Sequence, residues 1–270
     1  MTRKLSRKEI AEIGIYDFLG YIGAFNTPFI GGMDGTFNLL KKLQITEDSH
    51  VLEVGCATGF TSCMIAEKYG CSVTGIDLSE ILVEKARERA EKHNLTNVSF
   101  EVANALNLPF KDDTFDSVFA VAVTALIPDK YAALKEYLRV AKPKGVIGTL
   151  DLFLRESAPA EARNKFNKIF MDILGSDNEI MNISEWRNLF GELGLNGVQI
   201  DENYNNVFEM PRNRSSATGA TLKLVYHMII NGEVRRRAMK LMRMRNTVTL
   251  KSEGEYENVG YLIFKAMKPY

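Results

Sequence analysis

The sequence has few residues that form disulfides or bind metal ions. Its 270 residues include three histidines and three cysteines, Cys56, Cys63 and Cys71. An odd number at irregular spacing, with no Cys-x-x-Cys pair, argues against a disulfide framework and leaves a zinc site without an anchor. We therefore expect a cytoplasmic chain without a metal site.

The sequence also lacks long apolar runs and an excess of charge of either sign. No window approaches the roughly 18 uncharged residues of a membrane span, and Glu9 and Glu12 make the N-terminal stretch too polar for a signal peptide. Because 34 basic residues balance 34 acidic residues, we expect no nucleic-acid partner. The exception is the basic run from Arg235 to Arg245. It predicts a solvated helix face or, as the alternative, a contact with a membrane surface or an acidic substrate.

The middle of the sequence alternates between short apolar runs and helical patterns. Apolar runs without polar alternation indicate strands covered on both faces, and helices between them indicate a parallel sheet. The pattern predicts an α/β fold with a doubly wound, seven-stranded, mostly parallel sheet. The expected strands are 51–54, 72–76, 98–102, 117–123, 146–154, 197–201 and 258–267. The expected turns are 31–34 and 142–145. One or two helices are expected over 7–25, a helix broken near Asn231-Gly232 is expected over 221–245, and the other expected helices are 36–43, 61–69, 80–93, 128–141, 160–174 and 184–193.

We expect a single domain over residues 1–270. Its parts are an N-terminal helical cover (1–45), a cofactor-binding core (46–154), helical insertions around a sixth strand (155–257) and the final strand (258–270).

The two long connections after the fifth and sixth strands leave the sheet at its ligand-binding edge, because ligands of such sheets bind beyond the carboxyl ends of the strands. Residues 155–195 and 205–250 are therefore predicted to form a lid and an acceptor wall. The second segment has apolar residues that we expect to pack on another surface. That surface is the sheet edge, the substrate or a second copy of the chain in a homodimer. These residues are Leu222, Leu224, Val225 and Met228.

A glycine-rich turn follows the first predicted strand. Gly55 and Gly59 lie between this strand and a helix, where glycine permits a sharp turn and a close approach. Asp77 ends the next strand, where a carboxylate accepts hydrogen bonds from both hydroxyls of a ribose. A turn with glycines for geometry alone, and a solvated Asp77, is the structural alternative. The two features together favour a nucleoside site.

Glu53, just before the turn, helps to distinguish between nucleotide cofactors. The spacing Gly55-x-x-x-Gly59 is not the G-x-G-x-x-G pattern of an NAD site. A negative charge at Glu53 would repel a pyrophosphate, whereas it favours a cationic amino-acid tail. S-adenosylmethionine (SAM) has such a tail and no phosphate, so the sequence favours SAM over NAD.

These motifs resemble those of the class I SAM-dependent methyltransferases. The resemblance is to the small-molecule branch with the ubiquinone/menaquinone, tocopherol-type and glycine/sarcosine enzymes, and it is good over about residues 30–150. The matching segments are 51–59, 75–79, 108–110, 114–116, 128–129 and 139–145. The resemblance implies a Rossmann-like fold that binds SAM and transfers its methyl group to a small molecule.

The resemblance also assigns residues to the cofactor. Glu53, the turn Gly55-Cys56-Ala57-Thr58-Gly59 and a covering segment with Gly31, Gly32 and Thr36 would bind the methionine part. Asp77 would bind the ribose. The adenine would contact Leu78, Asn104, Ala105 and Leu106, and the fourth strand would lie along the cofactor with Ala120 and Val121.

The chain departs from the family pattern at four positions. Asn104 replaces an aspartate, although its amide oxygen can still accept from the adenine amine. Ala57 and Lys144 replace glycines. Ala125 stands where the family often has histidine, so no general base can be assigned from the resemblance.

We expect methyl transfer by in-line displacement, which needs alignment and exclusion of water more than a base. Three residues are candidates for contact with the acceptor: Tyr21, Phe25 and His227, of which His227 is the only catalytic candidate. Helix packing is the alternative for each. A macromolecular methyltransferase that acts on RNA or protein, or a SAM-binding regulatory protein without turnover, remains an alternative. The sequence Ala120-Val121-Ala122-Val123 lacks the Asn/Asp-Pro-Pro-Tyr motif of base amino-group methylation.

Overall fold

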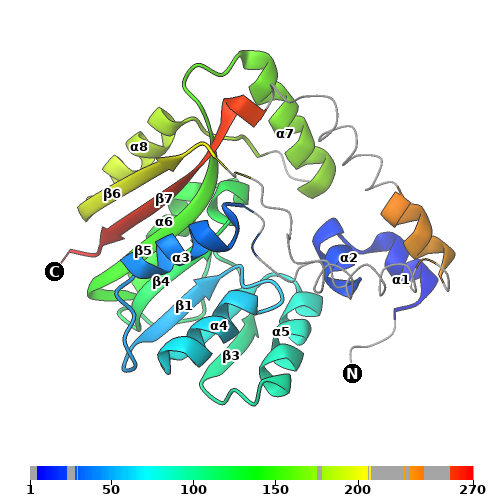
Figure 1. Ribbon diagram of the computed structural model, residues 1–270, viewed down its shortest axis with the longest axis horizontal. Coiled ribbons are helices and arrows are strands. Elements are labelled where there is room, and N and C mark those ends of the chain that lie inside the picture. Colours follow the sequence, from blue (N-terminus) through cyan, green and yellow to red (C-terminus); the bar gives the residue numbers. More distant parts are fainter. Residues whose placement is uncertain are drawn as a thin grey trace.

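The central element of the computed structural model is one seven-stranded sheet with the strand order β3-β2-β1-β4-β5-β7-β6 (Figure 1). The structure describes residues 5–22, 28, 30–174, 178–205, 207, 228, 231–239 and 256–269. The strands are β1 (His50–Val54), β2 (Ser72–Asp77), β3 (Val98–Val102), β4 (Phe115–Val121), β5 (Ala141–Leu154), β6 (Asn196–Asn203) and β7 (Val259–Met267). β7 is antiparallel to both β5 and β6, and the other neighbours are parallel. The predicted α/β fold with a mostly parallel, seven-stranded sheet is confirmed.

The order of the strands reverses between β1 and β4, which pair from Val51 with Ser117 to Val54 with Ala120. In open sheets of this kind, ligands bind in the crevice outside the carboxyl ends of the strands at such a reversal. Because β6 runs parallel to β5, both strands end at the same edge as β1 and β4. The two long connections therefore leave the sheet at the ligand-binding edge, as the sequence predicts.

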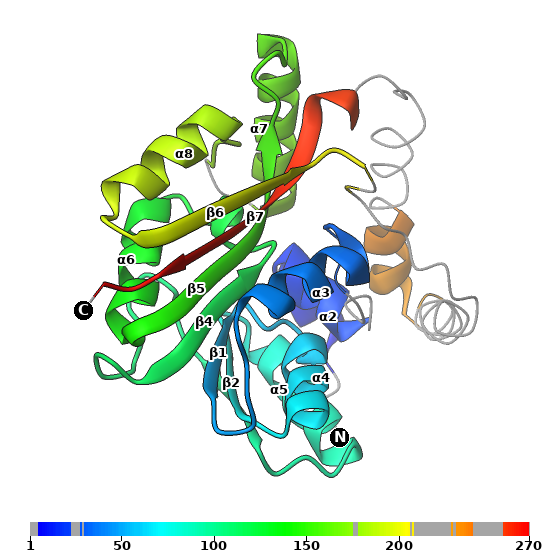
Figure 2. The ribbon, with the colours of Figure 1, turned by 60° about the vertical axis from the view of Figure 1, so that its left-hand side comes forward.

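Helices cover both faces of the sheet (Figure 2). On one face lie α3 (Gly32–Lys42), α4 (Phe60–Tyr69) and α5 (Glu80–Lys92), and on the other lie α6 (Lys130–Val140) and α8 (Ile183–Glu192). Each face has its own apolar core. Trp186, Phe190 and Phe264 stack in the core under α8, and Leu39 and Phe119 are buried in the core under α3. Burial on both faces explains why the strands are almost uniformly apolar.

The N-terminal helices α1 (Arg7–Glu12) and α2 (Ile15–Tyr21) form a smaller unit with the helical residues 232–239. Phe18 and Tyr21 share an apolar cluster with Val234 and Ala238, and the Arg237 guanidinium lies 4.6 Å from the centre of the Phe18 ring. This unit lies beyond the carboxyl end of β1 (Figure 1). The cover and part of the late insertion are therefore one packed body, which the sequence does not predict.

Several predicted boundaries are wrong. Residues 31–34 are not a turn, because α3 already begins at Gly32, after the left-handed Gly31. β4 ends at Val121, two residues early, and Ala122 is left-handed with φ 60°. Residues 142–145 are not a free turn but an irregularity within β5, since Phe115 pairs with Ala141 and Ser117 with Val146.

The remaining helical elements lie along the carboxyl edge and its connections. α7 (Ala160–Leu174) follows β5. The short helix η1 (Thr124–Leu126) follows β4, and the short helix η2 (Tyr256–Asn258) precedes β7. The predicted helix 221–245 is described only at residue 228 and over 231–239, where it is helical except at Asn231. No helix among the described residues is long and apolar enough to cross a membrane.

Candidate functional site

The turn between β1 and α4 is fixed by positive backbone angles. Gly55 has φ +71° and Gly59 has φ +70°. A Cβ at Gly55 would lie 2.3 Å from Val123 Cγ2, and a Cβ at Gly59 would lie 2.7 Å from Phe100 Cζ and 2.8 Å from Ala86 Cβ. Both glycines are therefore needed by the packing of the chain itself, in addition to any ligand.

Asp77 connects the glycine-rich turn to the end of β2. Its two carboxylate oxygens accept hydrogen bonds from the backbone N–H of Ala57 (2.9 Å) and of Ser79 (3.0 Å). Burial raises the pKa of Asp77, and these N–H donors oppose the rise. Each oxygen keeps a further lone pair. The carboxylate can therefore hold the turn and still accept from a ligand, and its bond to Ala57 explains how a non-glycine residue adopts φ 47° there.

Glu53 lies buried on β1 behind the turn. Its carboxyl group accepts a hydrogen bond from the Ser62 hydroxyl on α4. Burial raises the pKa of Glu53 to about 8, and the nearby Asp77 adds to the rise. A buried acidic group of this kind is stabilised in its charged form by a cation and disfavours an anion.

An exposed apolar surface lies beside Asp77, at the ends of β2 and β3. Leu78 is 71% exposed, Val102 49% and Leu106 39%. Exposed apolar side chains that gather in one place can mark a ligand-binding surface. The Asn104 side-chain oxygen accepts a hydrogen bond from the Leu106 N–H at 2.9 Å, so it holds the loop and has one acceptor position left.

Two residues on α2 lie over Asp77, and the sequence prediction missed both. The Ser79 hydroxyl donates to the Asp17 carboxylate. Burial, and then the negative charge of Asp77, raise the pKa of Tyr16 above its usual value. In the sequence Asp17 is only a charge that interrupts an apolar stretch. Its role depends on the close packing of α2 on α5, where Gly20 lies against Leu82.

The end of β4 forms the opposite wall of the turn. Ala120 is fully buried and Val121 is half-buried. Val123, which was not among the predicted site residues, packs on Gly55. Sequence patterns do not find this contact, because it depends on the left-handed turn at Ala122.

The predicted covering segment has evident packing roles. A Cβ at Gly31 would lie 3.1 Å from the Tyr261 ring and 3.2 Å from Leu150, so this glycine allows α3 to approach the sheet. Gly32 opens α3, and its carbonyl accepts from the buried Thr36 hydroxyl at 2.9 Å. Contact of Gly31, Gly32 and Thr36 with a cofactor stays a prediction.

The other predicted residues of the turn are largely buried. The Cys56 N–H donates to the Ile76 carbonyl at 2.8 Å, and the Thr58 carbonyl accepts from Arg89 Nε at 2.8 Å. Ala105 is buried at the end of the β3 loop.

Of the three residues that are predicted to contact the acceptor, only Tyr21 lies among the described residues. Tyr21 is buried in the cluster between α1, α2 and residues 231–239. Phe25 and His227 lie outside the described residues. Their contact with an acceptor stays a prediction, and no catalytic base is assigned.

The basic run is only partly a solvated face. Arg235 and Arg236 are exposed, but Arg237 stacks on Phe18 and donates to the Ile10 carbonyl. Lys240, Arg243 and Arg245 lie outside the described part of the chain.

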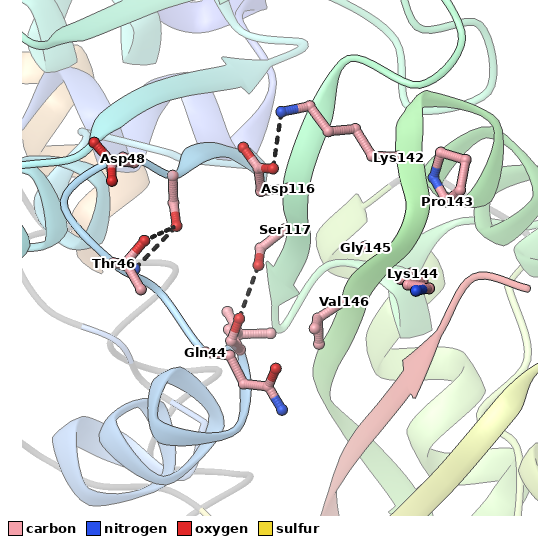
Figure 3. A pocket seen from close by; sticks show the side chains of 12 residues that line it. Gln44, Thr46, Asp48, Asp116, Ser117, Lys142, Pro143, Lys144, Gly145 and Val146 are labelled. Carbon is pink, nitrogen blue, oxygen red and sulfur yellow. Dashed lines mark hydrogen bonds and ion pairs between the residues drawn. The ribbon is translucent and has the colours of Figure 1, made fainter. Parts of the chain in front are cut away.

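A hollow on the molecule lies at the opposite edge of the sheet, where β4 and β5 begin (Figure 3). Several of its polar groups pair with one another or with the backbone. Lys142 Nζ lies 2.8 Å from Asp116 Oδ1, and the Ser117 hydroxyl donates to the Leu43 carbonyl at 2.9 Å. The hollow is remote from Asp77 and is no part of the candidate site.

The comparisons with known proteins agree with this geometry. A family model described as a methyltransferase domain matches residues 45–194. An uncharacterized protein of Haemophilus influenzae is 32% identical over 193 residues, which are 69% of this chain and 73% of that protein.

Two further relatives extend the comparison. The demethylmenaquinone methyltransferase of Listeria welshimeri is 36% identical over 114 residues, which are 42% of this chain, and the match spans only 48% of that enzyme. The crystal structure of the cyclase SpnF has a TM-score of 0.69 at 19% identity, and the match covers 94% of each chain. At this identity the last likeness shows the fold alone.

Proposed function

The chain belongs to the class I SAM-dependent methyltransferases, and on this basis we propose that it transfers the methyl group of SAM to a small-molecule acceptor. The observation that carries the proposal is Asp77 at the end of β2. It is bonded to the glycine-rich turn and is flanked by the exposed Leu78. A ribose with an adjoining base needs a carboxylate beside an apolar surface.

The residues of the site fit SAM part by part. Asp77 accepts from the ribose hydroxyls, and the exposed side chains of Leu78, Val102 and Leu106 pack on the adenine. Glu53 lies behind the turn, on the side of the amino-acid tail, where a cation would stabilise the charged form of its buried carboxyl group. When bound, SAM supplies a methyl group that its positive sulfur makes electrophilic.

The carboxylates beside the turn disfavour a dinucleotide. Asp77 and Asp17 lie there, whereas the raised pKa of the buried Glu53 keeps that group largely protonated unless a cation stabilises its charged form. The N-terminus of α4 thus faces an acidic region, and a pyrophosphate placed there would be repelled.

The residues of the chain mainly align the acceptor and exclude water, two effects that can supply much of the rate, and no general base is assigned. The turn after β4 is the fixed wall on the acceptor side, and α2 with residues 231–239 forms a cover. The demethylmenaquinone methyltransferase among the relatives supports an acceptor of the small-molecule class.

Residues 205–250 complete this cover as an acceptor wall. Replacing them with a short Gly/Ser linker should abolish transfer to the natural acceptor. SAM binding should change little, because α2 keeps its own contacts with α5 through Asp17 and Gly20. A folded, shortened protein that turns over at the normal rate would show that the segment does not bind the acceptor.

Methyl transfer itself is tested with SAM labelled in the methyl group and a small-molecule extract of cells. We expect label in a low-molecular-weight product with the intact protein and not with Asp77→Ala. Label found in RNA or protein would instead support a macromolecular acceptor. Binding of SAM with no labelled product in any fraction would support a SAM-binding protein without turnover.

A further inference from the structure

The turn that follows β4 lies at the reversal between β1 and β4. It begins with the left-handed Ala122 and with Val123, which packs on Gly55, and continues into η1. Thr124 and Ala125 in η1 are buried. A shift of this turn would therefore move the wall that touches the glycine-rich turn.

Side chains from outside the turn hold both backbone groups of Ala125. Asp151 on β5 accepts from the Ala125 N–H at 2.9 Å, and Asn178 donates to the Ala125 carbonyl at 2.6 Å. Lys130 on α6 donates to the Asn178 side-chain oxygen at 2.7 Å and to the Ile127 carbonyl at 3.1 Å. The turn is thus clamped by residues from three separate parts of the chain.

The three clamping side chains are buried, although two of them, Asp151 and Lys130, are ionisable. Asp151 is 0% exposed, Asn178 2% and Lys130 7%. Burial raises the pKa of Asp151 to about 6 and lowers the pKa of Lys130. Buried charges often cost as much in desolvation as their attraction returns, so stability alone is a poor reason for a chain to keep them.

The cluster extends to hydroxyl groups behind the turn. The Asp151 Oδ2 atom and the hydroxyls of Thr124, Thr149 and Tyr137 have no hydrogen bond of normal geometry. The two threonine hydroxyls nevertheless lie near enough to Asp151 to lower its pKa. This polar cluster is costly to bury, and it ends on the backbone of Ala125, in a turn at the ligand-binding edge of the sheet. Control of the position of that turn explains the cluster best.

We propose that Asp151, through the Ala125 N–H and together with Asn178 and Lys130, positions the turn after β4 as the rigid acceptor-side wall of the site. Asp151 is a positioning residue, since its carboxyl group is fully buried and acts through the Ala125 N–H. That the turn is a wall of the acceptor site rests on the proposed methyltransferase function. The hydrogen bonds that hold the turn follow from the structure alone.

The clamp is tested by amide hydrogen exchange at Ala125 and by calorimetry with S-adenosylhomocysteine, the demethylated product of SAM. In Asp151→Ala the Ala125 N–H loses its buried acceptor, so its exchange should accelerate about tenfold or more, and affinity for the product should fall several-fold. Asp151→Asn keeps an oxygen at the same place. It should restore slow exchange and product affinity to within about twofold of the parent, even if its melting temperature is lower.

Asp116→Ala is the matched control, because Asp116 also accepts a backbone N–H, that of His50 at 2.8 Å, but at the opposite edge of the sheet. It should leave Ala125 exchange and product affinity unchanged. If Asp151→Ala does not fold, Asn178→Ala loosens the same turn, because it removes the bond to the Ala125 carbonyl and one acceptor of Lys130, and it should change Ala125 exchange and product affinity in the same direction.

Two results overturn parts of the reasoning separately. Unchanged exchange and unchanged affinity in folded Asp151→Ala, or failure of Asp151→Asn to restore either, would overturn the positioning role. A parent protein that binds neither SAM nor its product would overturn the proposed function, and the exchange rates alone would then decide whether Asp151 holds the turn.

Discussion

Gly55→Ala is predicted to destabilise the protein through two separate effects. The left-handed backbone at φ +71° costs a residue with a Cβ about 1–2 kcal/mol. The new Cβ would lie 2.3 Å from Val123 Cγ2 and 2.9 Å from Cγ1, and such overpacking costs about 1–3 kcal/mol more. The expected loss is therefore about 2–5 kcal/mol, a large part of the roughly 5–15 kcal/mol that holds a domain folded.

Thermal unfolding measures this loss, since about 1 kcal/mol shifts the melting temperature by roughly 2–4 °C in a chain of about this size. Val123→Ala supplies the control. It removes both γ-carbons but not the strained backbone angle, so the double variant should regain about 1–3 kcal/mol relative to the sum of the single changes. A Gly55→Ala protein within about 0.5 kcal/mol of the parent, or strictly additive variants, would refute the contact between Val123 and the glycine-rich turn.

Two further predictions concern the site. The carboxyl group of Glu53 has a pKa of about 8 in the folded protein, against an ordinary value of 4.5 that applies to the unfolded chain. Between these two pH values only the unfolded chain loses this proton. The free energy of unfolding therefore falls as pH rises from about 5 to 8, by up to roughly 1.4 kcal/mol per pH unit. Glu53→Gln should flatten this part of the pH–stability curve in urea unfolding, and an unchanged slope would mean that Glu53 is not its source. Asn104→Ala should weaken SAM binding by about 1 kcal/mol, the value of one hydrogen bond. Asn104→Asp should bind at least as well as the parent, because it keeps both the acceptor for the Leu106 N–H and one for adenine. Severe loss with aspartate would show that position 104 faces an acidic group.

The sequence is sufficient to predict the parallel sheet, because apolar strands and intervening helices have periods that follow from burial on both faces. It also places the glycine-rich turn and Asp77 together, since both lie at strand ends of one edge. Ser79 is the N-cap of α5, a position that serine favours by residue type, and its hydroxyl accepts from the Leu82 N–H.

Contacts between distant segments were beyond sequence reasoning. Asp17 lies over Ser79, 62 residues later in the chain, because α2 packs on α5, and Arg237 lies on Phe18 because residues 232–239 pack on the N-terminal helices. Asp151 is one residue in an apolar strand by pattern, and only the folded chain shows that it bonds to Ala125. Such contacts leave no periodic signal, so side-chain positions at the acceptor side depend on the structure.

The central claim is tested most directly by calorimetric titration of the protein with SAM and, separately, with NAD. We predict that SAM binds and that NAD does not. Asp77→Ala should weaken SAM binding by about 1.5–3 kcal/mol, the usual loss of a charged hydrogen-bond partner. Asp112→Ala, which removes an exposed carboxylate elsewhere, should bind as the parent does. Tight binding of NAD without SAM, or an Asp77→Ala variant with unchanged affinity for SAM, would contradict the account.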